Sequence, residues 1–396
     1  MYRIENFSMI FDDEFNDEFN KQIIIDMKQV RKIVFNQKSK FNKPINYLPY
    51  GINVVIFGDE FNQPICCQKN GHEYECECEP ILPSSLKILK FGRNFNQFIG
   101  NLPKHLIDIS FGDCFNKVFR NLPFSLKTLQ FGLHFNKPFC SYNDRNTYKH
   151  HCIIPSCLNT LILGDDFNQP ICCEIEEHNG CSCQKSFPDS IKILRFGQCF
   201  NQPLSRNLYK TKNVVQRLPS FLIDLEFGHC FDQQICSYVE NILPESLKSL
   251  RLGNYFNKPV CCQIEGHFNC DCLFKLPKEL RFLELGNEFN QPINNLPNLR
   301  TLIIGADFDH QISCNCEGYC YCQKRLPKTL ITLLFSTYSK FNKKINNLPD
   351  TIEILKIGKY FSQDIRKLPY NLSKIILHKK FRNLLPNQPS VSIIFE

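Results

Sequence analysis

One short pattern recurs along nearly the whole chain, and this recurrence restricts the fold more than any other feature of the sequence. The copy at residues 276–293 reads LPKELRFLELGNEFNQPI, and similar copies begin at Leu82, Leu102 and Leu122. A sequence that repeats at a short fixed interval is typical of solenoid proteins, in which each repeat packs only against its neighbours.

Each copy predicts a short strand, a bend and an extended return. Leu283 and Leu285 lie two residues apart, which is the spacing of side chains on one face of a strand. Gly286 follows at once, where we expect a positive φ as the chain leaves the strand. We expect Phe289 to point back into the interior, and the amide of Asn290 to bond neighbouring backbone groups within the bend.

The length of the repeat explains why its copies must stack. Phe95, Phe115 and Phe135 occupy the same place in three copies and are 20 residues apart. Such a unit carries about five large apolar side chains, too few to offset the conformational entropy lost when it is ordered. We therefore predict a β-rich solenoid of stacked units with a parallel β-sheet and little helix.

Several copies are longer, because a segment of about 11 to 14 residues separates the end of one unit from the Leu-Pro start of the next. Equivalent positions stack in a solenoid, so these insertions should project from one edge or from the back. We predict a degenerate N-terminal repeat or cap at residues 1–40, the repeat solenoid at 41–381 and a C-terminal cap at 382–396.

The string Phe-Asn-x-Pro-Ile ends the copies at residues 61–65, 167–171 and 289–293. It resembles the FNIP repeat, a family named for that string, and the preceding Leu-x-x-Leu-x-Leu run resembles a leucine-rich repeat. The resemblance implies a leucine-rich-repeat-like stack that serves as a protein-interaction scaffold, and it brings no catalytic residues. Some members of the family carry an N-terminal F-box, but the repeats here begin too early to leave room for one. A substrate adaptor in ubiquitin transfer is therefore a weaker alternative.

Charge and motif content exclude several functional classes. The chain has 47 basic and 39 acidic residues, and the formal net charge of +8 is not gathered into blocks. We interpret this as a solvated surface and not as a nucleic-acid footprint. No secretory signal and no membrane-spanning apolar stretch is present, which predicts a soluble, intracellular protein without a membrane partner. No phosphate-binding loop, dinucleotide fingerprint, nucleophile elbow or zinc-protease motif occurs, so we expect no enzymatic activity.

Four of the insertions are rich in cysteine and together hold 16 of the 23 cysteines. Each of the first three offers four thiols and one imidazole, which match the ligand types and number that Zn²⁺ requires. Two other interpretations remain open, namely disulfides that staple each loop and unpaired thiols. The candidate zinc ligands are Cys66, Cys67, His72, Cys76, Cys78, Cys172, Cys173, His178, Cys181, Cys183, Cys261, Cys262, His267, Cys270, Cys272, Cys314, Cys316, Cys320 and Cys322.

The variable strand positions are where a protein partner would be recognised. They should line one exposed face of the sheet, and their mixed charges disfavour nucleic acid. Apolar residues among and beside them predict a partner-binding patch towards the C-terminal half, although these side chains can also simply pack on one another. The function predicted is a non-enzymatic scaffold for an unknown protein, and the alternative is a zinc-binding protein. The candidate partner-binding residues are Phe282, Ile303, Leu334, Ile354 and Ile376.

Overall fold

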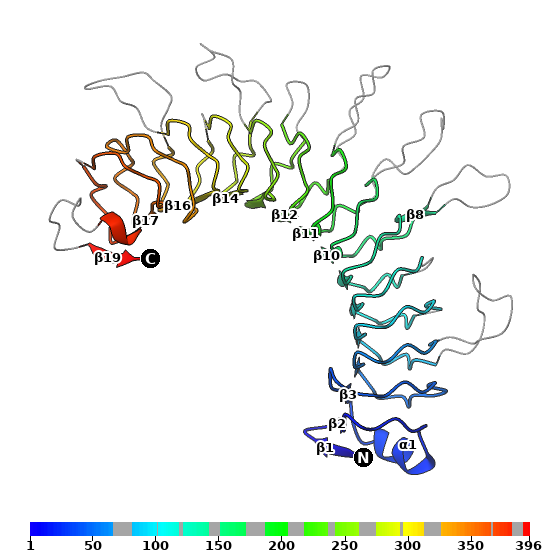
Figure 1. Ribbon diagram of the computed structural model, residues 1–396. Helices are drawn as coiled ribbons and strands as arrows, with labels where there is room; N and C mark the ends of the chain where they lie inside the picture. The colour runs from blue at the N-terminus through cyan, green and yellow to red at the C-terminus, as the bar shows by residue number, and fades with distance from the viewer. Residues whose placement is uncertain are drawn as a thin grey trace, which may run out of the picture. The chain divides into compact units, whose positions relative to one another are not determined.

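The computed structural model describes residues 1–65, 81–100, 102–118, 122–141, 151–171, 187–204, 218–236, 242–260, 275–293, 296–312, 326–365, 367–381 and 391–396. These residues form two compact units, Met1–Gly197 and Gln198–Glu396 (Figure 1). The predicted boundaries at residues 40 and 381 therefore stay predictions, as does the continuity of one solenoid across both units.

The sheet of the first unit begins with an antiparallel hairpin and continues as parallel strands. β1 pairs antiparallel with β2, and each later neighbour is parallel, with β7 pairing directly with β10. β8 and β9 form a separate antiparallel pair. The strands are β1 (Tyr2–Glu5), β2 (Ser8–Phe11), β3 (Lys32–Phe35), β4 (Val54–Ile56), β5 (Ile88–Lys90), β6 (Asp108–Ser110), β7 (Thr128–Gln130), β8 (Cys140–Ser141), β9 (His151–Cys152), β10 (Thr160–Ile162) and β11 (Ile193–Arg195).

The sheet of the second unit is parallel throughout its described strands. Consecutive strands pair in sequence order, from β12 to β19. These strands are β12 (Asp224–Glu226), β13 (Ser249–Arg251), β14 (Phe282–Leu285), β15 (Thr301–Ile304), β16 (Thr332–Phe335), β17 (Ile354–Lys356), β18 (Lys374–Leu377) and β19 (Ser392–Phe395).

Helix is scarce in the described part of the chain. It is limited to α1 (Lys21–Met27) and the 3₁₀ turn η1 (Lys379–Phe381). Asn20 caps α1, since its Oδ1 accepts a hydrogen bond of 2.9 Å from the backbone N–H of Ile23. The prediction of a β-rich, leucine-rich-repeat-like solenoid with a parallel sheet and little helix is therefore confirmed.

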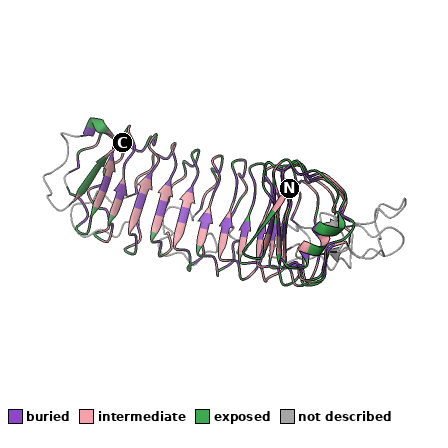
Figure 2. Ribbon diagram, turned by 90° about the horizontal axis from the view of Figure 1, so that it is seen from below, coloured by how far each residue is buried: buried purple, intermediate pink, exposed green. Residues whose placement is uncertain are grey.

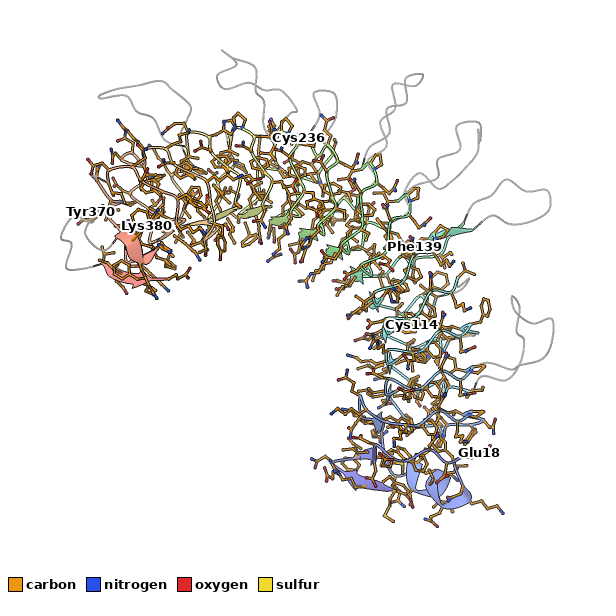
Figure 3. The ribbon with its side chains drawn as sticks, viewed as in Figure 1. Glu18, Cys114, Phe139, Cys236, Tyr370 and Lys380 are labelled. Carbon is orange, nitrogen blue, oxygen red and sulfur yellow. The ribbon has the colours of Figure 1, made fainter. Side chains whose placement is uncertain are left out.

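The core lies behind each strand. The middle residue of every three-residue repeat strand is buried between two partly exposed or exposed neighbours, an alternation that Figure 2 shows along the strands. Behind the strands, the phenylalanines predicted to point inward form a continuous stack. Phe95, Phe115 and Phe135 are at most 1% exposed, and consecutive ring centroids lie 6.1 Å apart. Figure 3 shows the side chains that fill each unit between its strands and its return segments.

A column of asparagine side chains joins each repeat unit, or rung, to the next. The side chain of Asn290 does not bond within its own bend as predicted, because its Oδ1 accepts from the backbone N–H of Asp309 at 3.1 Å in the next rung. The same bond recurs along both units. The column consists of Asn16, Asn42, Asn62, Asn96, Asn116, Asn136 and Asn168 in the first unit, and of Asn201, Asp232, Asn257, Asn290, Asp309 and Asn342 in the second.

Glycine follows the strand for a different reason from the one predicted. Among the described glycines, only Gly51 has a positive φ, at 106°. A Cβ on Gly286 would instead lie 1.8 Å from the carbonyl oxygen of Gly253 in the preceding rung. Equivalent clashes with the preceding rung arise along both units. The glycines are thus required by the close approach of rungs and not by backbone conformation.

Two rungs replace this glycine and lengthen the turn. Asn36 and Ser336 stand in its place, and each is followed five residues later by the stacked phenylalanine, against three in the regular copies. A buried serine fills the extra space in both rungs. Ser39 and Ser339 are at most 1% exposed, and their hydroxyl oxygens accept hydrogen bonds of 3.3 and 3.2 Å from the backbone N–H of the following phenylalanine.

Candidate partner-binding surface

The outer face of the second unit is formed by the first and third residues of β12 to β18. These positions alternate with the buried middle residues, so their side chains point away from the core. The parallel register aligns first residues with first residues and third with third across the sheet. The result is two straight columns of side chains that cross the strands.

The strand register places all five predicted partner-binding residues on the outer face, where each is partly exposed. Ile303 lies directly opposite Leu334 on the neighbouring strand, so these two form one apolar contact surface. Lys356 stands between Leu334 and Ile376 in the same column. The apolar positions are therefore interrupted by a charge, and partner binding by them stays a prediction.

Phe282 is partly covered by a neighbouring cation. The guanidinium carbon of Arg251 lies 4.6 Å from the centre of its ring. The same guanidinium is held between two carboxylates, with Nη1 3.1 Å from Asp224 and Nε 3.8 Å from Glu284. The outer face of β12 to β14 thus carries three acidic residues, Asp224, Glu226 and Glu284, and one basic residue, Arg251, and the Arg251 guanidinium covers part of the Phe282 ring.

The other end of the face is tied to the last described residue. Nζ of Lys356 lies 2.6 Å from Oε2 of Glu396, and the Thr337 hydroxyl lies 3.4 Å from the same oxygen. The hydrogen bond from Lys356 lowers the pKa of the Glu396 carboxyl below its ordinary value, against a smaller opposing effect of burial. This link holds the end of β19 against β17 across the intervening strand.

Apolar residues on the sheet of the first unit were missed by the sequence analysis. The third residues of β2, β3 and β4, which are Ile10, Val34 and Ile56, are aligned in register and partly exposed. Val54 and Ile88 occupy neighbouring first positions. The signal was present in the sequence, because these residues hold the same place in the earliest copies as the ones selected near the C-terminus.

All of the candidate zinc ligands lie outside the described residues, so zinc binding stays a prediction. Within the described ranges, no three His, Cys, Asp or Glu side chains are grouped so as to hold a metal ion. His310, just upstream of the fourth cysteine-rich loop, has a ring nitrogen 3.0 Å from the backbone oxygen of Asn290. Cys236, labelled in Figure 3, is 2% exposed and its Sγ donates to the carbonyl of Val260.

Comparison with known families decides the nature of the repeat. The family model described as FNIP Repeat matches residues 80–114 and 214–254. Residues 80–114 and 214–254 therefore carry the FNIP repeat. The matched segments include β5, β6, β12 and β13, with the turns and stacked phenylalanines between them.

A solved structure with a similar fold is described as a leucine-rich-repeat protein. The crystal structure of CroV588, described as a novel circular LRR protein, is 28% identical with a TM-score of 0.63, and the match covers 100% of this chain. The present chain spans 60% of the length of that protein. YopM from Yersinia enterocolitica is 16% identical with a TM-score of 0.44, over 93% of this chain and 72% of its own. No curated protein gives a significant match in sequence. No helix within the described ranges has the length and apolar character needed to cross a bilayer.

Proposed function

We propose that this FNIP-repeat protein is a non-enzymatic scaffold that binds a protein partner on the outer face of its second unit. The observation that carries the proposal is the pair Ile303 and Leu334, apolar residues that lie side by side and partly exposed on a regular sheet. Among the described elements of the second unit itself, Figures 1 and 2 show no helix or strand over this face. Solenoid repeats present long surfaces of this kind, which suit protein partners.

The proposal is tested by placing charge in the apolar pair. Leu334→Asp changes an outward side chain, so the rung beneath it should still fold, whereas a partner that packs there must desolvate the new carboxylate. Ile162→Asp is the matched control, because Ile162 holds the same strand position on β10 of the first unit. Quantitative cross-linking capture should show partners that are lost with Leu334→Asp and kept with Ile162→Asp. Unchanged partners in a variant with the parental circular dichroism spectrum contradict the proposal.

Zinc binding by the cysteine-rich loops is the second candidate. It is supported by the recurrence of one Cys/His pattern in three insertions at the same place in the repeat. Metal analysis of protein purified under reducing conditions tests it, and fewer than about one zinc ion per chain removes it. The adaptor role in ubiquitin transfer stays a prediction without a supporting contact.

A further inference from the structure

A row of three cations borders the outer face of the second unit. Lys248, Arg281 and Arg300 are the residues immediately before β13, β14 and β15. The backbone N–H of Arg281 donates to the carbonyl of Lys248 at 2.9 Å, and that of Arg300 donates to the carbonyl of Arg281 at 2.8 Å. The three residues therefore occupy the same position in three successive rungs. We call them the basic row.

The charge of the basic row is only partly compensated. Arg281 lies 3.3 Å from the carboxylate of Glu279. Lys248 and Arg300 are exposed, and neither forms an ion pair with any residue in the described part of the chain. Neighbouring strands of a sheet are about 4.8 Å apart, and like charges directly opposite on adjacent strands repel one another. A carboxylate lying against the row would relieve this repulsion.

The basic row adjoins the apolar part of the face. Arg300 is followed on its own strand by Thr301, Leu302 and Ile303, and Ile303 packs beside Leu334. Ile331 holds the equivalent position in the next rung, because its backbone N–H donates to the carbonyl of Arg300 at 2.9 Å. An exposed positive border and an apolar surface thus meet within two strands.

The acidic residues of the same face do not cancel this border. Asp224 and Glu284 lie 3.1 and 3.8 Å from Arg251, and Glu226 is opposite Arg251 in the strand register, so all three carboxylates are next to that guanidinium. A phosphate backbone is a poor fit for a different reason, since it carries no apolar side chain to cover Ile303 and Leu334. The charge pattern favours a partner that combines carboxylates with apolar side chains.

We propose that the partner bound by the outer face is an acidic, apolar protein segment. Its carboxylates lie against Lys248 and Arg300, and its apolar side chains cover Ile303 and Leu334. This inference rests on the proposed function, since it names the chemistry of the partner for the same face. Arg281 is the middle member of the basic row. Because its side chain is already paired with Glu279, it contributes less to recognition.

Selection of peptides by the purified full-length chain tests this inference without knowledge of the natural partner. The probe is a phage-displayed library of random 16-residue peptides, and enriched sequences are synthesised and measured by fluorescence anisotropy. Enriched peptides should carry more Asp and Glu than the unselected library, together with aliphatic or aromatic residues. Their binding should weaken as NaCl is raised, because salt screens exposed charges.

Three variants separate the inference from the function on which it rests. Lys248→Glu with Arg300→Glu should weaken peptide binding at least about tenfold. Lys87→Glu should leave it unchanged, because Lys87 is exposed at the same repeat position before β5 of the first unit. Leu334→Asp should abolish it. Circular dichroism confirms that each variant is folded.

The possible outcomes distinguish failure of the acidic partner from failure of the scaffold proposal. Peptides that depend on Leu334 but are neutral or basic, or are unaffected by reversal of Lys248 and Arg300, overturn the acidic partner and leave the scaffold proposal standing. Enrichment of no peptide that depends on Leu334 overturns both. Tight binding of a single-stranded oligonucleotide, competing with the peptides and lost in the charge-reversal variant, replaces the acidic segment with a nucleic acid.

Discussion

The asparagine column gives a sharp prediction about stability, and Asn136 is a suitable member to change. Its Oδ1 accepts two hydrogen bonds from the next rung, one of 3.1 Å from the backbone N–H of Asn168 and one of 2.9 Å from the side-chain amide of Gln169. Asn136→Ala removes the acceptor and leaves both donors in place. The stacked phenylalanines are untouched by the change.

The expected magnitude follows from these two bonds. A typical intramolecular hydrogen bond contributes about 1 kcal/mol net, and leaving a buried donor unsatisfied costs about 1–3 kcal/mol. The N–H of Asn168 is part-buried, so the loss of its acceptor costs more than the loss of the acceptor of the Gln169 amide, which can turn towards water. We therefore expect Asn136→Ala to lower the free energy of unfolding by about 2–3 kcal/mol.

Urea unfolding followed by far-ultraviolet circular dichroism measures this loss, with hydrogen exchange to show where the opening occurs. Asn94→Ala is the control, since Asn94 is an asparagine of the same unit outside the column. Its change should alter the free energy of unfolding by less than about 0.5 kcal/mol. Equal destabilisation by the two variants, or faster exchange elsewhere than at Asn168, would refute the role given to the column.

Three further predictions concern other contacts. The double variant Asn136→Asp with Gln169→Lys should be more stable than the sum of the two single changes, by about 0.5 kcal/mol in a double-mutant cycle. The reason is that the second unit uses such Asp–Lys pairs, at 2.7 and 2.8 Å. Additive effects of the two changes on the free energy of unfolding would contradict this prediction. Gly112→Ala should destabilise the first unit by more than about 4 kcal/mol, since the new Cβ would lie 1.9 Å from the carbonyl oxygen of Gly92 in the preceding rung. An unchanged melting temperature would contradict this clash. The pKa of the Glu396 carboxyl is lowered. Its bond to Lys356 therefore stabilises β19 at pH values above the ordinary carboxyl pKa of 4.5, and this stabilisation is lost as the pH falls through the folded-state pKa. Amide exchange in β19 should rise on acidification, and Lys356→Met should remove that pH dependence.

Features that recur within each copy were readable from the sequence. The position of every repeat strand and the inward stacking of Phe95, Phe115 and Phe135 follow from spacing alone, because solenoid repeats place equivalent residues in equivalent environments. The alignment of Ile303 with Leu334 follows from the same logic.

Contacts between rungs were harder to predict, because a linear pattern shows what each copy contains and not which neighbour it touches. The glycines and asparagines were correctly recognised as special, but their roles were assigned within one bend when they act between rungs. Asp232 and Asp309 replace asparagine and pair with Lys258 and Lys343 of the following copy. Lysine stands at the same place in Lys43, Lys117 and Lys137 after copies with asparagine, so the exchange did not reveal the contact.

Pairings specific to one place in the chain left no recurrent signal. The contacts of Arg251 with Phe282 and of Lys356 with Glu396 each occur once among the described residues. They depend on side chains at variable positions, whose neighbours are set only when the strands come into register. The interruption of the predicted apolar patch by Lys356 belongs to this class.

A photo-crosslinker placed in the apolar pair tests the central claim most directly. Benzoylphenylalanine incorporated in place of Leu334, with Ile162 replaced in the matched control, reports which proteins lie within reach of each face in living cells. The account predicts protein adducts from position 334 that are absent from position 162. Adducts of equal yield from both positions, or none from position 334 in a folded and expressed protein, would contradict it.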